Sequence, residues 1–172
     1  AINRPKKFDV VICEVGGTVG DIESLPFMEA IRQLSLEVGY HNHTMMHVTL
    51  VPYIQASEEL KTKPTQHSVM KLREIGLSPD MILCRTDHKL TKDVRNKIGL
   101  FGNLNPEHVI EGSEVKSIYE VPLTLYNQNV SEIIMDRLQL SGKADVSYLK
   151  TFIKKFKEPK HNVNICLLYT SP

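Results

Sequence analysis

Short apolar runs rich in β-branched residues alternate along this chain with stretches that repeat apolar residues at helical spacing. The strand-like runs lie at residues 8–15, 46–51, 80–85, 109–110 and 163–168. Helices are predicted at residues 24–38, 64–75, 91–101, 117–126 and 130–138, and residues 141–160 predict an amphipathic helix followed by a basic, proline-containing linker. Such alternation is typical of parallel β-α units, in which each helix returns the chain to begin another strand. The sequence therefore predicts an α/β fold, a mostly parallel sheet with helices on both faces.

Composition narrows the class of protein. The 172 residues are 41% hydrophobic and 24% charged, which is typical of a globular domain rather than a disordered chain. A net charge of +1 gives no global field that would favour nucleic acid or a membrane surface. Three widely spaced cysteines predict neither a disulfide framework nor a zinc site, and a reducing cytoplasm is the expected compartment.

The run VVICEVGGTVGDIESLPF, residues 10–27, combines a predicted strand with a glycine-rich turn. Glycines let the backbone take positive φ or approach a ligand closely. A phosphate-binding loop of the type G-x-x-x-x-G-K-[ST] would also need a lysine, and that pattern is absent from the chain. The run therefore predicts a ligand site of another kind.

Acids flank this turn, with Glu14 at the end of the predicted strand and Asp21 and Glu23 before the next helix. Carboxylates hold cations or accept hydrogen bonds from hydroxyl and amino groups. Glu14 therefore fits a magnesium ligand, and Asp21 and Glu23 fit a sugar or base. For Asp21 and Glu23, favouring the following helix N-terminus through its dipole is an equally good interpretation.

The run KTKPTQ, residues 61–66, leads through Pro64 into a predicted helix N-terminus. Lysines, threonine hydroxyls and free helix amides together suit a polyphosphate. From composition alone, a solvated loop is the favoured interpretation, and Lys97 alone fits a surface lysine. The spacing of His41, His43 and His47 is not that of a zinc site, and solvated or hydrogen-bonded histidines are expected there.

Three motifs, GGTVGDIES, KTKPTQ and SIYEVP, stand in this order along the chain. Together they resemble the CTP synthase family, glutamine-dependent enzymes that aminate UTP. The resemblance runs from about Phe8 to Leu140, and the first two motifs form a highly specific pair. It implies the second half of the amidoligase, or synthetase, domain, with a P-loop-NTPase-like fold.

The resemblance implies a role for each matching position, although it assigns no catalytic side chain here. Glu14 matches an acid that helps hold Mg²⁺ at the ATP phosphates. The pyrimidine nucleotide, especially CTP as feedback inhibitor, is contacted at positions matching Asp21, Ile22 and Glu23. The phosphates of UTP or CTP are bound at positions matching Lys61, Thr62, Lys63, Pro64, Thr65, Gln66 and Lys97. The adenine side of ATP is contacted at Ser113, Glu114 and Val115, with Arg85 a weaker candidate; the family pattern has aspartate where Glu114 stands.

The resemblance also implies a two-stage reaction and its partners. ATP phosphorylates the C4 oxygen of UTP, and ammonia then displaces phosphate. A glutaminase domain supplies the ammonia from glutamine, GTP acts as activator, and the UTP site forms where subunits of a homotetramer meet. Neither nucleic acid nor a membrane is expected as a partner.

The expected organisation is the C-terminal part of the amidoligase domain at residues 1–140, a linker at 141–162, and a truncated glutaminase start or non-native tail at 163–172. The chain is thus expected to be cut at both ends and inactive alone. Two other interpretations remain: a non-catalytic pyrimidine-nucleotide-binding regulatory module, and another ATP-dependent ligase on the same scaffold.

Overall fold

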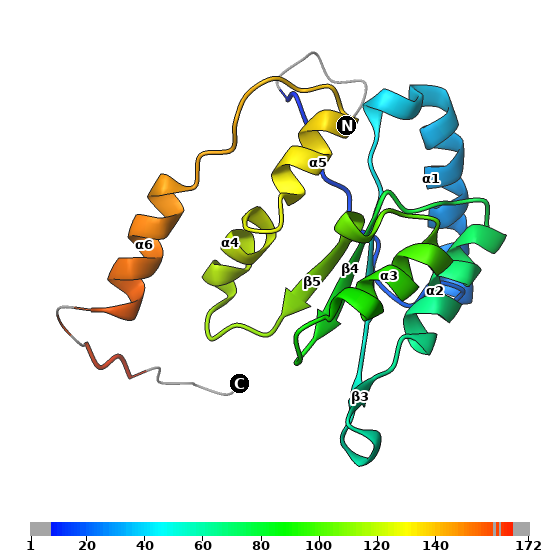
Figure 1. Ribbon diagram of the computed structural model, residues 1–172. Coiled ribbons are helices and arrows are strands. Elements are labelled where there is room, and N and C mark those ends of the chain that lie inside the picture. The colour runs from blue at the N-terminus through cyan, green and yellow to red at the C-terminus, as the bar shows by residue number, and fades with distance from the viewer. Residues whose placement is uncertain (1–7, 160, 162, 167–172) are drawn as a thin grey trace, which may run out of the picture.

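A parallel three-stranded sheet forms the centre of the computed structural model, which describes residues 8–159, 161 and 163–166 (Figure 1). Its strand order is β1-β4-β5, with bounds Met46–Leu50, Met81–Thr86 and Val109–Ser113. The register sets Met46 beside Met81 and Ile82 beside Val109. Because all three strands run in one direction, their carboxyl ends lie along one edge of the sheet. The predicted α/β fold is confirmed.

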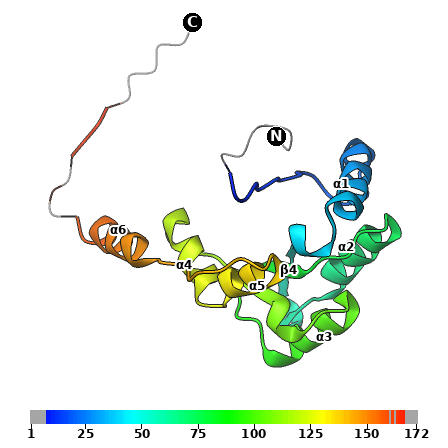
Figure 2. The same cartoon turned by 90° about the horizontal axis from the view of Figure 1, so that it is seen from above.

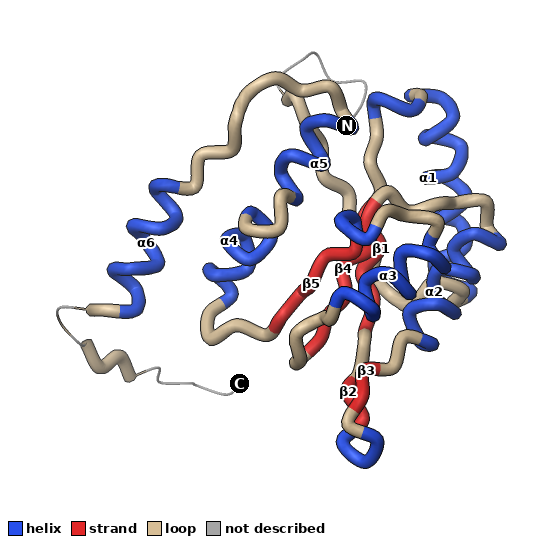
Figure 3. Tube along the Cα trace, viewed as in Figure 1, coloured by secondary structure: helices blue, strands red, loops and turns tan. Residues whose placement is uncertain are grey.

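Each predicted helix appears, although several bounds differ by a few residues. The helices are α1 Leu25–Val38, α2 Lys63–Glu74, α3 Lys92–Gly102, α4 Val121–Tyr126, α5 Val130–Arg137 and α6 Ser147–Lys157. None of the described helices combines the length and the apolar character needed to cross a bilayer. A short antiparallel hairpin of β2 (Tyr53–Ile54) and β3 (Glu59–Leu60), which the sequence pattern did not predict, projects beyond β1 (Figure 3).

Helices cover both faces of the sheet, as predicted. On one face, Val69 of α2 and Ile98 of α3 pack with Ile82, Cys84 and Val109 of the strands. On the other face, Val130 of α5 packs with Met81 and Ile110, and Leu125 of α4 lies against this cluster. Seen from above, α1, α2 and α3 lie to one side of β4 and α4 lies to the other (Figure 2).

The prediction of a strand at residues 8–15 is wrong, because these residues pair with no other strand and are largely exposed. A strand exists only through hydrogen bonds to a neighbouring strand, and no described residue offers them here. β-branched residues supply a preference for extended backbone, but they supply no partner. Residues 163–166 of the last predicted strand are also irregular, and residues 167 and 168 lie outside the described residues.

A glycine in α3 explains how closely the chain turns back after this helix. A Cβ on Gly99 would lie 2.8 Å from the Leu104 carbonyl oxygen and 3.4 Å from the Pro106 nitrogen. The Leu104 N–H also donates to the Gly99 carbonyl at 2.9 Å. The segment that leads into β5 therefore packs directly against the helix backbone.

We expect Gly99→Ala to lower the free energy of unfolding by about 1–3 kcal/mol, because the methyl group meets backbone atoms that cannot move aside. In an unhindered helix the same change stabilises by about 1 kcal/mol. Urea unfolding followed by circular dichroism measures the difference. Asn96→Ala, on the exposed side of α3, is the matched control, and an increase in stability for Gly99→Ala would contradict the packing described.

Candidate functional site

The glycine-rich turn is held by local hydrogen bonds and positive-φ glycines. Gly17 and Gly20 have φ angles of 88° and 103°, which other residues rarely adopt. Between them, the Thr18 N–H donates to Asp21 Oδ2 at 3.2 Å and the Asp21 N–H donates to the Thr18 carbonyl at 3.1 Å. A 3₁₀ turn, Ile22–Ser24, then leads into α1. Ser24 is at the predicted cap position, but its hydroxyl donates to the Asp21 carbonyl at 2.9 Å and caps no N–H.

The three candidate acids line one hollow of about 290 Å³. Its lining comprises Glu14, Val15, Gly16, Gly17, Asp21, Glu23, Ser24 and Phe27. Among the described residues, none of the three carboxylates forms an ion pair, so each can accept hydrogen bonds or contact a cation. Ile22, between two of these acids, is 84% exposed and points its apolar side chain at solvent. Nowhere in the described part of the chain do three or more His, Cys, Asp or Glu side chains lie close enough together to hold one metal ion.

The lysine stretch begins α2 at the carboxyl edge of the sheet. Thr62 is the N-cap residue and Pro64 stands in the first turn. Both threonines are buried: Thr62 Oγ1 accepts from Gln66 Nε2 at 2.9 Å, and Thr65 Oγ1 lies 3.1 Å from both the Leu50 carbonyl and Thr49 Oγ1. The Thr65 hydroxyl therefore anchors the helix to β1, the Thr62 hydroxyl bonds within the helix, and the free first-turn N–H groups remain available.

Lys97 belongs to α3, whose Ile98 packs with Val69 of α2. The Glu59 carboxylate is paired with Lys61, and the hydrogen bond from Lys61 is the main reason that the pKa of Glu59 is lowered. The positive charge of Lys97 also contributes to this shift, as the smallest of its causes. Lys61 and Lys63 thus stand at the N-terminus of α2, and Lys97 is carried by the neighbouring helix α3.

The predicted adenine-side residues follow the ends of the two neighbouring strands. Ser113 is the last residue of β5 and pairs with Thr86, and the exposed Glu114 and half-buried Val115 come next. Arg85 is exposed on β4 and stands opposite Gly112. Because side chains alternate along a strand, Arg85 points to the face opposite Ser113.

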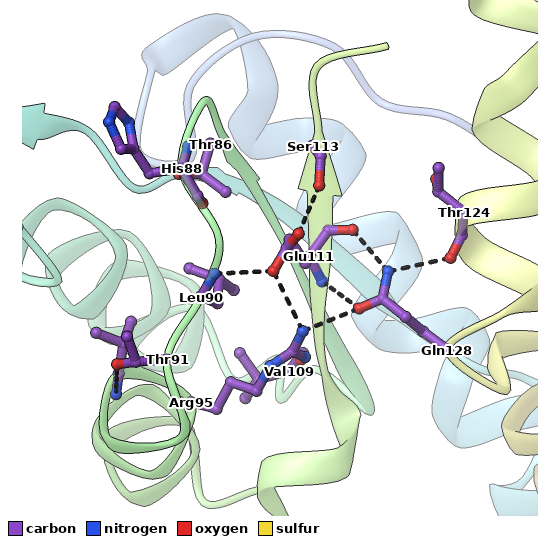
Figure 4. Close-up of polar contacts among 11 residues, drawn as sticks. Thr86, His88, Leu90, Thr91, Arg95, Val109, Glu111, Ser113, Thr124 and Gln128 are labelled. Atoms are coloured by element: carbon purple, nitrogen blue, oxygen red, sulfur yellow. Dashed lines mark hydrogen bonds and ion pairs between the residues drawn. The ribbon is translucent and has the colours of Figure 1, made fainter.

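A polar network that the sequence reasoning missed supports this edge (Figure 4). The Gln128 side chain accepts from the Glu111 N–H at 2.8 Å and donates to the Glu111 carbonyl at 2.8 Å. Its Oε1 also accepts from Arg95 at 3.2 Å, and its Nε2 donates to the Thr124 carbonyl at 3.1 Å. The amide thus takes the place of a neighbouring strand beside β5. An acid inside the apolar run VIEGS was the only sequence signal for this network.

The acid-lined hollow and the lysines lie at different ends of α2. Val15 and Val19 pack with Met28, Leu72 and Leu77, near the last turn of α2. The lysine stretch lies at its first turn, and a helix of 12 residues is about 18 Å long. The structure therefore brings the acids together, but it does not join them to the lysine stretch.

Comparison with known proteins gives consistent matches. Residues 1–140 match the family described as CTP synthase N-terminus. A CTP synthase of Caldanaerobacter subterraneus subsp. tengcongensis is 52% identical over 97% of this chain and 31% of its own length. CTP synthases of Chloroherpeton thalassium and Aquifex aeolicus are 51% and 50% identical, each over 95% of this chain and 30% and 31% of their own lengths. The chain therefore spans about a third of these relatives.

We expect Thr65→Val to lower the free energy of unfolding by about 1–3 kcal/mol, because the Leu50 carbonyl loses its buried hydroxyl donor. Thr151→Val, which removes an exposed hydroxyl bonded to the Ser147 carbonyl on α6, serves as the control and should change stability far less. Chemical denaturation of both variants measures this. Equal stability of Thr65→Val and the wild type would mean that the hydroxyl does not anchor α2.

Proposed function

The chain belongs to the CTP synthase family, through the N-terminal synthetase domain, and we propose that it forms part of an enzyme that converts UTP to CTP. Within that domain we assign the chain to the second half, with residues 141–162 as a linker and residues 163–172 as the start of a glutaminase domain or a non-native tail. The whole enzyme would be a glutamine-hydrolysing C–N ligase of pyrimidine biosynthesis in the cytoplasm.

The placement of Lys61 and Lys63 at the N-terminus of α2, with Lys97 on the neighbouring helix α3, is the observation that carries this proposal. Cations are unfavourable at the positive end of a helix dipole, so lysines placed there favour an anionic ligand. Free N–H groups of the first turn add donors for phosphate oxygens. We assign residues 61–66 and Lys97 to the triphosphate of UTP, or of CTP as feedback inhibitor.

The acid-lined hollow would serve the remaining ligands. Glu14 fits one ligand of Mg²⁺, since this ion commonly takes one or two carboxylates together with substrate phosphates. When bound, the ion would neutralise charge on the transferring phosphoryl group. Asp21 and Glu23 offer free acceptors for donor groups of a pyrimidine nucleotide, with Ile22 contributing apolar contact. Ser113, Glu114, Val115 and Arg85 would bind the adenine side of ATP.

In the proposed reaction, ATP phosphorylates the C4 oxygen of UTP, and ammonia then displaces phosphate at that carbon. A glutaminase domain would supply the ammonia from glutamine, and GTP would activate the enzyme. Assembly as a homotetramer would complete the UTP site where subunits meet.

A second candidate is a non-catalytic module that binds pyrimidine nucleotide and regulates a partner. The separation of Glu14 from Lys61 and Lys63 along α2 favours this candidate, because phosphoryl transfer needs both nucleotides in contact. Formation of CTP by the full-length protein distinguishes the two: a catalytic protein forms it, and a regulatory module does not.

We expect Lys61→Ala in the full-length protein to weaken UTP and CTP binding by about tenfold or more, since a charge-assisted hydrogen bond to phosphate is lost. ATP binding should be retained. Isothermal titration with each nucleotide measures this, and Lys71→Ala, near the other end of α2, is the matched control. Equal UTP affinity in Lys61→Ala and the wild type would contradict the assignment of the lysine stretch.

We expect Glu14→Gln to raise the Mg²⁺ concentration needed for half-maximal ATP binding by about tenfold or more. Loss of a residue that only hydrogen-bonds to a metal ligand already lowers metal affinity by about tenfold, and loss of a ligand should lower it at least as much. Titrating Mg²⁺ at fixed ATP provides the measurement. Glu37→Gln, an exposed acid on α1, should leave the midpoint unchanged. An identical Mg²⁺ midpoint in Glu14→Gln and the wild type would remove Glu14 from the metal site.

A further inference from the structure

The Glu111 carboxylate joins two loops at the carboxyl edge of the sheet (Figure 4). Its Oε2 accepts from the Leu90 backbone N–H at 2.8 Å, and its Oε1 accepts from the Ser113 hydroxyl at 2.6 Å. Leu90 ends the loop that follows β4, and Ser113 ends β5. One side chain thus sets the position of both segments beside the proposed adenine site.

The position of Glu111 is itself fixed from several directions. Its backbone N–H and carbonyl are both bonded to the Gln128 amide, and its side chain is only 16% exposed. Arg95 lies 3.5 Å from Oε2 and also donates to the carbonyl of Val109, which precedes Glu111 on the same strand. A carboxylate held in this way does not have to be ordered when a ligand binds.

In the hydrogen bond between Glu111 and Ser113, only one of the two side chains can be the donor. An ionised carboxylate has no hydrogen to donate, so the Ser113 hydroxyl must be the donor. The single hydroxyl hydrogen is then committed to Glu111. Toward a ligand, Ser113 Oγ can present only a lone pair, and it therefore seeks a donor.

Adenine and guanine carry different hydrogen-bonding groups on carbon 6 of the ring. Adenine carries an amino donor at N6, where guanine carries the acceptor O6. We propose that Glu111 is a positioning residue that makes Ser113 a hydrogen-bond acceptor and thereby favours adenine over guanine nucleotides at this edge of the sheet. The inference rests on the proposed function, in which Ser113 contacts the base of ATP.

The test uses Glu111→Gln in the full-length enzyme, with ammonia as nitrogen source so that the glutaminase is not needed. The introduced amide can still accept from the Leu90 N–H, but its amino group donates toward Ser113, whose hydroxyl is then free to donate. We expect kcat/KM for ATP to fall about tenfold, as for one lost hydrogen bond, and the preference for ATP over GTP to fall by at least as much. The KM for UTP should stay within about twofold.

Glu107→Gln, an exposed acid just before β5, is the matched control and should keep the wild-type preference. If Glu111→Gln does not fold, Ser113→Ala leaves the Leu90 contact intact and should show the same loss of preference. If both single variants fold, the double variant should lose no more of the preference for ATP over GTP than Ser113→Ala alone, because the two changes remove the same interaction.

Unchanged ATP-over-GTP preference in Glu111→Gln, or in Ser113→Ala where that variant replaces it, would overturn the inference while leaving the proposed function intact. Parallel rises in KM for ATP and UTP would also overturn it, because they would indicate a general loss of structure. A wild-type enzyme that forms no CTP would overturn the proposed function, and this inference with it.

Discussion

Burial of β4 on both faces is the constraint on which the rest of this structure depends. Met81, Ile82 and Cys84 are fully buried, and they face two different helix layers. Water is excluded from this strand, and burial raises the pKa of the Cys84 thiol to about 11. Because β1 and β5 pair with β4 in parallel register, the same strand aligns the loops that carry the candidate ligand contacts.

The two outer strands of the sheet, β5 and β1, differ in what lies beside them. Beside β5, the Gln128 amide satisfies the outward N–H and carbonyl of Glu111, so a side chain replaces a strand. On β1, Val48 and Leu50 remain 53% and 60% exposed. Residues 8–15 carry the residue types of a strand but have no described partner. The outer strand whose backbone is bonded by Gln128 is β5, and it leads into the proposed adenine site.

Much of the fold and part of the site could be predicted from sequence. Helical spacing, Pro26 and Pro64 in first turns, Gly76 and the Thr91 cap are local signals, and all mark real helix ends. The gathering of Glu14, Asp21 and Glu23 also follows from local geometry, because a short segment with a glycine turn holds them together. The β2–β3 hairpin and the Gln128 contacts could not be predicted, since neither short strands nor a polar side chain far along the chain leaves a periodic signal.

The sequence by itself determined the fold class, the helix ends and the family, because these depend on spacing and on motifs read along the chain. Only the tertiary structure decided which polar groups were free to act. It committed the Thr65 hydroxyl to anchoring α2 on β1, paired Lys61 with Glu59, and turned the Ser113 hydroxyl toward Glu111. A hydrogen bond depends on distance and direction in space, and the packed chain sets both, for neighbours such as Glu111 and Ser113 as well as for Thr65 and Leu50.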